Sequence, residues 1–284
     1  MTTRIVIDST TDMPQSIIDD YGIVVLPLHV LIEGKEYLDG IDIQTNEVYD
    51  YMRQDIMPKT SQIEIPTTAD KFRECLDRGE DLLYLAFSSK MSGTCQLVMG
   101  IMDELRASYP DRKMLTLDSR GGSFATGLIT IETAKSAAAG DSFEQTEARA
   151  RFLIDEVEHV FCITDLLWMI RGGRISKTLG YTASVLNIKP VLDVQDGEME
   201  VIAKVRGRKK ALNYVADIVA ERAKECPRQT IGITHADDME TALYMQELLH
   251  ERLPEADFLI EQIGAVLGVH IGIGGVGVFF FRHM

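Results

Sequence analysis

The sequence predicts an α/β protein of two units. The N-terminal unit, residues 1–158, is expected to hold a mostly parallel sheet covered by helices, and the C-terminal unit, residues 159–284, a mixed α/β sheet. Short β-branched or aliphatic runs alternate with helix-patterned segments through the first half, which is typical of a parallel sheet. In the second half Asp196-Gly197 stands between two apolar runs, and this dipeptide is a strong signal for a hairpin of antiparallel strands.

The N-terminal elements follow from apolar runs bounded by turn residues. Pro14 and Thr45 stand where helix starts are favoured, so helices are expected to begin there. The predicted strands cover residues 4–8, 22–32, 82–87 and 113–117, and the predicted helices cover residues 14–20, 45–53, 69–78, 95–108 and 124–139.

The C-terminal unit is entered through a long helix pattern over residues 143–157. The predicted strands cover residues 159–164, 190–194, 199–204, 229–234, 257–263 and 277–282, with helices over residues 209–224 and 238–249. The glycine-rich segment 264–277 contains the letters G-x-G-x-x-G, but a strand pattern follows it, so no dinucleotide site is predicted. Its glycines are expected to let the backbone approach a ligand or bend a sheet edge.

Charge and composition exclude several classes of protein. The 284 residues include 29 basic and 44 acidic side chains, a net charge of −15, so nucleic acid is not expected as a partner. No apolar run reaches the roughly 18 to 20 residues that span a bilayer, so no integral membrane segment is expected. Residues 1–8 pass directly into a strand pattern, which predicts no signal peptide and a cytoplasmic location.

The cysteines and histidines show no metal-binding spacing. Cys75, Cys95, Cys162 and Cys226 lie far apart in the chain, with no C-x-x-C pair. Free, mostly buried thiols are therefore expected, with no metal site and no cofactor.

Polar residues follow the first predicted strand. Asp8 and Ser9 stand at its carboxyl end, where parallel sheets bind ligands, and a site role and a structural role are equally supported. Asp12 directly precedes Met13-Pro14, so it is expected to cap the first helix.

Two hydroxyl-rich segments could hold an anion. Ser92-Gly93-Thr94 follows a strand and opens a helix, where backbone N–H groups and hydroxyls suit a carboxylate or a single phosphate, although Ser92 could simply be a cap. Thr60-Ser61-Gln62 alone would be an ordinary loop. Ser119 follows another strand in a segment that is expected to be mostly structural.

Arginines and one histidine complete the candidate residues. Arg171 and Arg174 flank paired glycines, where their guanidinium groups are available to a carboxylate, a phosphate or an acidic partner. Arg206 belongs to a basic cluster over residues 204–210, which is either a docking patch or a solvated helix start. His270 is a buried structural histidine or holds an acidic head group. A serine acyl hydrolase or acyltransferase with Ser92 as nucleophile and His270 as base is the alternative, although no G-x-S-x-G motif occurs.

The order of these motifs resembles the DegV family over nearly the whole chain. The motifs are Asp8-Ser9 with Asp12, Thr60-Ser61-Gln62, Ser88-Ser89 with Ser92-Gly93-Thr94, Asp118-Ser119, Gly172-Gly173-Arg174-Ile175, Lys189-Pro190, and His270 with Gly272 and Gly274. The resemblance implies two α/β units that hold one long-chain fatty acid between them. Members of the family include the fatty-acid-binding subunits of bacterial fatty acid kinase, which present the carboxylate to a separate ATP-using kinase subunit.

The resemblance also implies roles for individual residues. Thr60 and Ser92 would hydrogen-bond the carboxylate, with His270 beside it. Secondary positions around the head group are Ser61, Gly93, Thr94, Asp8, Ser9 and Ser119. Arg171 and Arg174 belong to the segment that is expected at the head-group end and at the face that docks the kinase, and Arg206 is also expected to dock the kinase. The protein would then be a carrier and not an enzyme. Ile63-Glu64-Ile65 stands where the family commonly has proline after Thr-Ser-Gln, and Ile271 and Ile273 replace a usual Thr and Pro, which leaves the preferred acyl chain open.

Overall fold

The computed structural model describes residues 2–164, 166–175 and 187–284. Its N-terminal part holds a parallel sheet of four strands in the order β2-β1-β6-β7. These strands are β1 (Thr3–Asp8), β2 (Val24–Leu26), β6 (Asp81–Ala86) and β7 (Met114–Asp118). The prediction of a parallel sheet in this half is confirmed.

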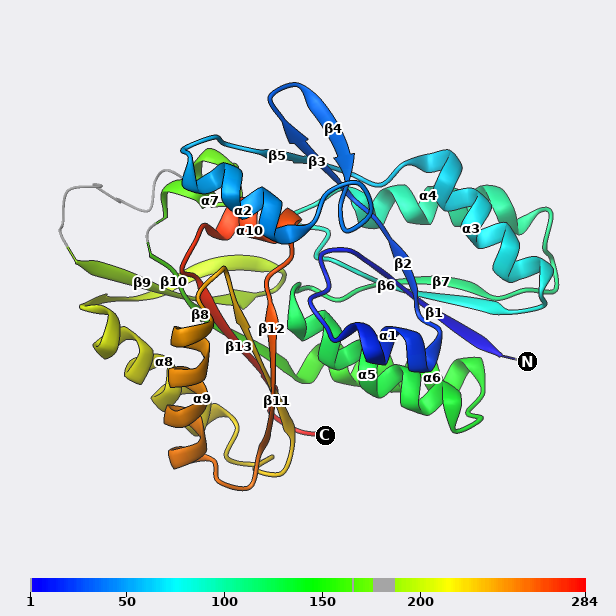
Figure 1. Cartoon of the computed structure of the whole chain (residues 1–284). Helices are drawn as coiled ribbons and strands as arrows, with labels where there is room; N and C mark the ends of the chain where they lie inside the picture. Colours follow the sequence, from blue (N-terminus) through cyan, green and yellow to red (C-terminus); the bar gives the residue numbers. More distant parts are fainter. Residues whose placement is uncertain (1, 165, 176–186) are drawn as a thin grey trace.

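Helices cover both faces of this sheet (Figure 1). Leu82 and Tyr84 of β6 pack in one core with α3 (Ile65–Asp77) and α4 (Thr94–Arg106). Leu83 and Leu85 point to the other face, which is covered by α1 (Gln15–Tyr21), α5 (Phe124–Ala138) and α6 (Phe143–Glu156). Successive side chains of a strand alternate between faces, so a continuous apolar run such as β6 is stable only with helices on both sides.

The C-terminal part is a mixed sheet of six strands, as predicted, in the order β10-β9-β8-β13-β11-β12. Its pairs are antiparallel except β11 with β12. The strands are β8 (Val157–Cys162), β9 (Ile188–Gln195), β10 (Glu198–Arg206), β11 (Thr230–His235), β12 (Asp257–Gln262) and β13 (Val276–Phe281). Helices α8 (Arg208–Arg222) and α9 (Met239–Arg252) pack on one face (Figure 1).

Helix α5 joins the two sheets. Its residue Phe124 packs in one core with Phe279 and Phe281 of β13, which face away from α8 and α9. A Cβ at Gly232 of β11 would lie 2.3 Å from the Phe124 ring, so this strand needs glycine where the helix crosses it. The packing of Phe124 on these strands brings the two sheets close together at this point. Farther along the strands, a space remains between the sheets.

A third, antiparallel sheet corrects two predictions. It has the order β4-β3-β5, with β3 (His29–Ile32), β4 (Lys35–Leu38) and β5 (Lys59–Ser61). The single strand predicted over residues 22–32 is wrong, because the chain leaves the parallel sheet after β2 and enters this one at β3. Pro27 lies at the break, and proline has no backbone N–H to continue a ladder. Residues 59–61 are an edge strand and not a loop.

Among the described residues, two short helices were not predicted, α7 (Leu167–Arg171) and α10 (Ala265–Ile271). Helix α10 occupies much of the glycine-rich segment whose glycines were expected to let the backbone approach a ligand or bend a sheet edge. It packs on α2 (Thr45–Arg53), whose bounds match the prediction. A Cβ at Gly268 would lie 2.4 Å from the Tyr49 hydroxyl, so glycine allows the two helices to meet. Among the described residues, none of the helices has both the length and the apolar character to cross a bilayer.

Candidate ligand-binding site

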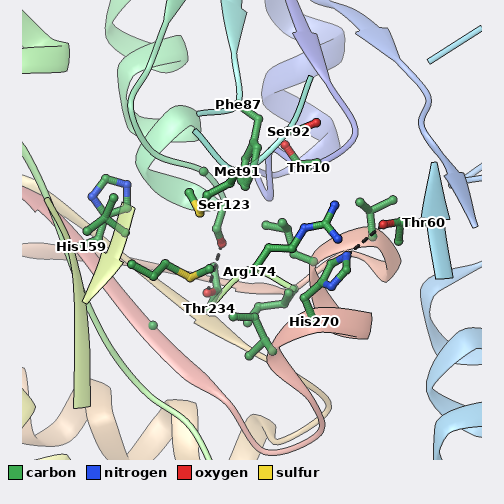
Figure 2. Close-up of a pocket in the computed structure, with 18 of the residues that line it drawn as sticks. Thr10, Thr60, Phe87, Met91, Ser92, Ser123, His159, Arg174, Thr234 and His270 are labelled. Carbon is green, nitrogen blue, oxygen red and sulfur yellow. Dashed lines mark hydrogen bonds between the residues drawn. The ribbon is translucent and has the colours of Figure 1, made fainter. Parts of the chain in front are cut away.

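A cavity of about 380 Å³ lies between the parallel sheet and the six-stranded sheet (Figure 2). We call it the central cavity. Its walls come from both halves of the chain and are largely apolar. The larger apolar residues that line it are Phe87, Met91, Phe161, Met199, Leu267 and Phe279. The space therefore suits a ligand with a long apolar part.

One polar group of the wall is a hydrogen-bonded pair. Thr60 of edge strand β5 and His270 of α10 meet with 2.9 Å between Oγ1 and Nε2. Burial, with a further contribution from the positive charge of Arg174, lowers the pKa of His270 to about 4. The imidazole is therefore neutral at pH 7. Its Nδ1 is buried and has no hydrogen-bond partner among the described residues.

Arg174 lines the cavity beside this pair. Its Nη1 donates to the Gly172 carbonyl oxygen at 2.5 Å. A Cβ at Gly172 would lie 2.2 Å from His270 Nδ1, so the loop that carries Arg174 packs directly on the histidine ring. Burial lowers the pKa of the half-buried guanidinium, but arginine keeps its charge in proteins. Within the described part of the chain no carboxylate pairs with it.

Ser92 and Gly93 also line the cavity, at the turn before α4. A Cβ at Gly93 would lie 2.3 Å from Gln62 Nε2, so this turn packs against the segment that carries Thr60. Ser61 lines the cavity as well, from an exposed position. The structure therefore brings together Thr60, Ser61, Ser92, Gly93, Arg174 and His270, which lie far apart in the sequence.

The hydroxyl of Ser92 is not paired with His270. It lies 3.0 Å from Thr94 Oγ1 and accepts from the Thr94 backbone N–H at 3.3 Å. Thr94 itself is buried in the first turn of α4 and does not line the cavity. The nucleophile–base hydrogen bond that a serine hydrolase needs is thus not formed between these two residues.

Three other predicted residues lie behind the cavity wall. Asp8 accepts hydrogen bonds from the hydroxyls of Tyr84, at 2.6 Å, and Thr10, at 2.5 Å. Ser9 Oγ accepts from the Leu28 backbone N–H at 3.1 Å, and Ser119 Oγ lies 3.1 Å from a hydroxyl of α5. These contacts order the loops that shape the cavity, while Thr10 itself lines it.

Asp12 does not cap the first helix, so that prediction is wrong. Pro14 is the N-cap of α1, and no side chain caps it. Asp12 instead accepts hydrogen bonds from Ser123 Oγ at 2.5 Å and from the Gly264 backbone N–H at 2.8 Å. It therefore joins α5 and the start of α10. Burial raises the pKa of this carboxyl to about 7.

Ser123 and Thr234 line the cavity, and the sequence analysis did not select them. Their hydroxyl oxygens are 3.4 Å apart, one from each half of the chain. Thr234 is near the carboxyl end of β11 and Ser123 follows β7, so the rule that drew attention to Asp8 and Ser9 also applied here. The signal was weak because Ser123 follows two glycines in a segment that was expected to be mostly structural, and Thr234 ends an apolar strand pattern.

Arg171 and Arg206 lie outside the cavity lining, exposed at the ends of α7 and β10. Ser176, which directly follows the Gly172-Gly173-Arg174-Ile175 motif, lies outside the described residues. No group of His, Cys, Asp and Glu that could hold a metal ion occurs in the ranges 2–164, 166–175 and 187–284.

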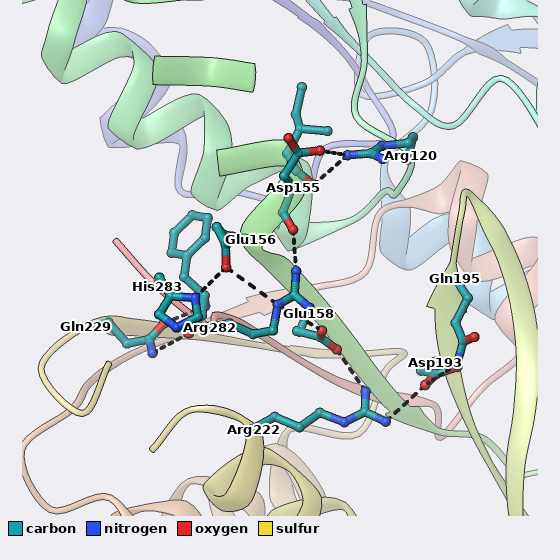
Figure 3. A network of polar contacts seen from close by, with 12 residues as sticks. Arg120, Asp155, Glu156, Glu158, Asp193, Gln195, Arg222, Gln229, Arg282 and His283 are labelled. Carbon is teal, nitrogen blue, oxygen red and sulfur yellow. Dashed lines mark hydrogen bonds and ion pairs between the residues drawn. The ribbon is translucent and has the colours of Figure 1, made fainter. Parts of the chain in front are cut away.

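A second cleft, of about 430 Å³, is polar and lies where α6, β8, β9 and α8 meet. Figure 3 shows the network of ion pairs along it. Arg222 pairs with Glu158 at 2.8 Å and with the buried Asp193 at 3.2 Å, and Arg120 pairs with Asp155. These charges compensate one another, so the network fits a structural role between the two halves.

Comparison with known proteins gives the family. The family model described as "Uncharacterised protein, DegV family" matches residues 2–283. The DegV domain-containing protein CPE0026 of Clostridium perfringens is 37% identical over 276 residues, which are 96% of this chain and 95% of the relative.

Two solved structures have the same fold. A DegV family protein from Thermus thermophilus, described by its fatty acid binding, is 29% identical with a TM-score of 0.89, and 99% of each chain is covered. DegV from Bacillus subtilis, described as a fatty acid binding protein, is 26% identical with a TM-score of 0.87, also over 99% of each chain. The matches extend over both sheets and the cavity between them, and the chain belongs to the DegV family.

Proposed function

We propose that this protein binds one long-chain fatty acid in the central cavity, with the carboxylate hydrogen-bonded by Thr60 and Ser92 and with His270 beside it. The lipid would lie between the units formed by residues 1–158 and 159–284. The related proteins from Thermus thermophilus and Bacillus subtilis, which are described as binding fatty acids, support this proposal. The fatty acid would be the ligand of the protein and not a cofactor.

One observation carries the proposal. The guanidinium of Arg174 lies half-buried at the wall of an apolar cavity, next to the neutral Thr60–His270 pair, and no described carboxylate compensates its charge. A desolvated charge is unfavourable unless it is paired. A ligand carboxylate would supply the missing anion, and its oxygens would accept hydrogen bonds from the surrounding hydroxyls. A neutral lipid would leave the guanidinium without a counter-ion.

His270 orients the Thr60 hydroxyl to donate a hydrogen bond to the ligand carboxylate. Because the imidazole is neutral, only one of its ring nitrogens carries a proton. If Nε2–H donates to Thr60 Oγ1, the hydroxyl proton of Thr60 is free to donate to a carboxylate. Ser92 Oγ accepts from the Thr94 backbone N–H, and if the Thr94 hydroxyl donates in their mutual hydrogen bond, Ser92 also keeps its proton for the ligand.

The apolar walls account for affinity without covalent chemistry. Burial of a methylene group contributes about 0.8 kcal/mol, so about 14 to 16 methylenes contribute on the order of 12 kcal/mol before ordering costs. The polar residues then have to fix only the position of the head group.

We further propose that the bound carboxylate is presented to a separate ATP-dependent kinase subunit, which forms the acyl phosphate. This step follows from the family resemblance. The exposed Arg171 and Arg206 are candidates for the electrostatic contact with that partner, since exposed charges at an interface mainly raise the rate of encounter. A cytoplasmic location fits a carrier of this kind.

Lipid extraction tests the proposal. Purified protein should release long-chain fatty acid in organic solvent, as identified by mass spectrometry, and delipidated protein should take up added fatty acid at a ratio of one per chain. If neither release nor uptake occurs, the fatty acid proposal is wrong. Incubation with an activated acyl ester should leave the intact mass unchanged, whereas an acyl adduct on Ser92 would support the hydrolase alternative.

A further inference from the structure

A second polar position exists in the central cavity, apart from the proposed head-group site. Figure 2 shows the facing hydroxyls of Ser123 and Thr234 away from the Thr60–His270 pair. Gly277 and Phe279 of β13 line the cavity nearby, and a Cβ at Gly277 would lie 3.2 Å from Thr234 Oγ1. The pair therefore faces the part of the cavity that an acyl chain, and not its carboxylate, would occupy.

The hydroxyls of Ser123 and Thr234 belong to a chain of hydrogen bonds that ends at Asp12. Asp12 already accepts from the Gly264 backbone N–H, and Ser123 Oγ donates to its other carboxylate oxygen at 2.5 Å. While Asp12 is ionised, the proton of Ser123 is thus committed behind the wall, and Ser123 Oγ can only accept from Thr234. Thr234 Oγ1 is 3.4 Å from Ser123 Oγ, which is a long hydrogen bond.

Thr234 consequently keeps unused hydrogen-bonding capacity. Its side chain is fully buried, and in the described part of the chain its hydroxyl makes no hydrogen bond besides the long one to Ser123. A hydroxyl offers one donor and two acceptor sites. A saturated chain would leave both acceptor sites of Thr234 empty against methylene groups, and an underused buried hydroxyl is unfavourable.

The backbone of Ser123 is held in an uncommon conformation. Its φ is 54° and its ψ is −141°, a region that residues other than glycine rarely adopt. The hydrogen bond from its N–H to the Thr10 carbonyl oxygen, at 3.1 Å, and the bond from its side chain to Asp12 hold it there. The surrounding structure thus fixes this hydroxyl in the wall despite a backbone that favours glycine.

From this arrangement we infer that the ligands include a long-chain fatty acid with a hydroxyl on the acyl chain, which donates to Thr234 or Ser123. The inference rests on the proposed function and names its substrate class. A hydroxyl fits because it supplies the donor that the pair lacks. A ketone supplies none, and could accept from Thr234 only by replacing its bond to Ser123.

The test compares stearic acid with hydroxystearic acids that carry the hydroxyl at successive mid-chain carbons, all titrated into delipidated full-length protein. In a cavity without a polar partner, every buried hydroxyl would weaken binding by more than about tenfold. We expect the acid with its hydroxyl at one favoured carbon to bind at least as tightly as stearic acid. The acids with the hydroxyl at neighbouring carbons should bind about tenfold more weakly than that favoured acid. The ketone at the favoured carbon should bind about fivefold more weakly than the alcohol.

Two variants test whether Ser123 and Thr234 cause the preference for one hydroxyl position. Thr234→Val keeps the shape of the side chain, and Ser123→Gly removes a hydroxyl while relieving the backbone, so both should fold. The variant that removes the hydroxyl to which the ligand donates should lower the Kd ratio of stearic to favoured hydroxystearic acid by about fivefold to tenfold. Thr133→Val is the matched control, because this buried threonine of α5 bonds to the Ile129 carbonyl oxygen and does not line the cavity.

The outcomes separate this inference from the proposed function. If stearic acid binds and every hydroxyl position weakens binding to the same extent, the hydroxy acid inference is wrong and the fatty acid proposal stands. If the favoured position persists unchanged in both variants, the hydroxyl is held elsewhere and the inference is likewise wrong. If stearic acid itself does not bind, the proposed function fails.

Discussion

The Thr60 hydroxyl and the His270 imidazole lie 2.9 Å apart although 210 residues separate them in the chain. An edge strand of the small sheet carries the threonine, and a short helix in a glycine-rich segment carries the histidine. Their pairing forms the proposed head-group position, because it aligns one hydroxyl with a neutral imidazole beside an arginine.

Loss of either head-group hydroxyl should weaken fatty acid binding. Thr60→Val or Ser92→Ala removes one donor to a buried carboxylate, which costs about 1.5 to 3 kcal/mol, or roughly tenfold to a hundredfold in Kd. Displacement of a fluorescent fatty acid from delipidated protein measures this. Thr116→Val is the control, since this half-buried strand threonine bonds to Met102 Sδ and not to the cavity. Unchanged affinity in both single variants and in the double variant would place the carboxylate elsewhere.

Arg174 should act in fatty acid binding, and Arg171 and Arg206 in the contact with the kinase partner. Arg174→Ala should weaken fatty acid binding about tenfold or more, because the buried carboxylate would lose its counter-ion. Arg171→Ala and Arg206→Ala, at exposed positions, should leave fatty acid binding intact and lower the rate of acyl-phosphate formation with the kinase partner. Isothermal titration and a reconstituted kinase assay at two salt concentrations distinguish these effects. Equal binding losses in all three variants would refute the division.

Gly172→Ala should disturb the histidine. A Cβ there would lie 2.2 Å from His270 Nδ1 and 3.3 Å from the Trp168 carbonyl oxygen, so the ring must move away. We expect a loss of about 1 to 3 kcal/mol in the free energy of unfolding and weaker fatty acid binding.

Gly100→Ala is the matched control for this substitution. Gly100 is in the interior of α4, and a Cβ would meet no atom within 4 Å. Because alanine favours helix more than glycine does, stability should rise by about 0.5 to 1 kcal/mol. Chemical denaturation measures both changes. Equal effects of the two substitutions would contradict the importance of the Gly172–His270 contact.

Asp12 should make the stability fall as pH rises. Burial raises the pKa of this carboxyl from 3.8 to about 7 in the folded protein. Between these values the folded state holds the proton more firmly than the unfolded chain, so this group lowers the free energy of unfolding from about pH 4 to pH 7, with no further change above. In Asp12→Asn the side chain stays neutral. The free energy of unfolding of this variant, relative to that of the wild type, should therefore increase by roughly 2 to 4 kcal/mol over that range.

Urea denaturation of both proteins across this pH range measures the difference. Burial lowers the pKa of His159 and His270 to about 4, which makes stability rise with pH, but this contribution is common to both proteins and cancels. Asp111→Asn, at an exposed position, is the control and should show no such trend. A constant difference between Asp12→Asn and the wild type would mean that Asp12 is ionised throughout.

Local patterns in the sequence determined the fold class and many of its elements. The alternating apolar runs predicted the parallel sheet, the Asp196-Gly197 turn predicted the β9–β10 hairpin, and the helix over residues 45–53 was placed at its observed bounds. These features depend on side-chain periodicity and turn chemistry, which act over a few residues. The motif order also identified the family before any contact was known.

Only the tertiary structure decided which residues meet. It divided the run over residues 22–32 between two sheets, formed α10 from a glycine-rich segment by packing it on Tyr49, and drew Asp12 away from the first helix to Ser123 and Gly264. It also placed Arg174 in the cavity wall but left Arg171 exposed, although the family resemblance associated both arginines with the head-group end and the kinase-docking face. Such outcomes depend on burial and on contacts between segments far apart in the chain, and these energies exceed the local preferences that a sequence pattern records.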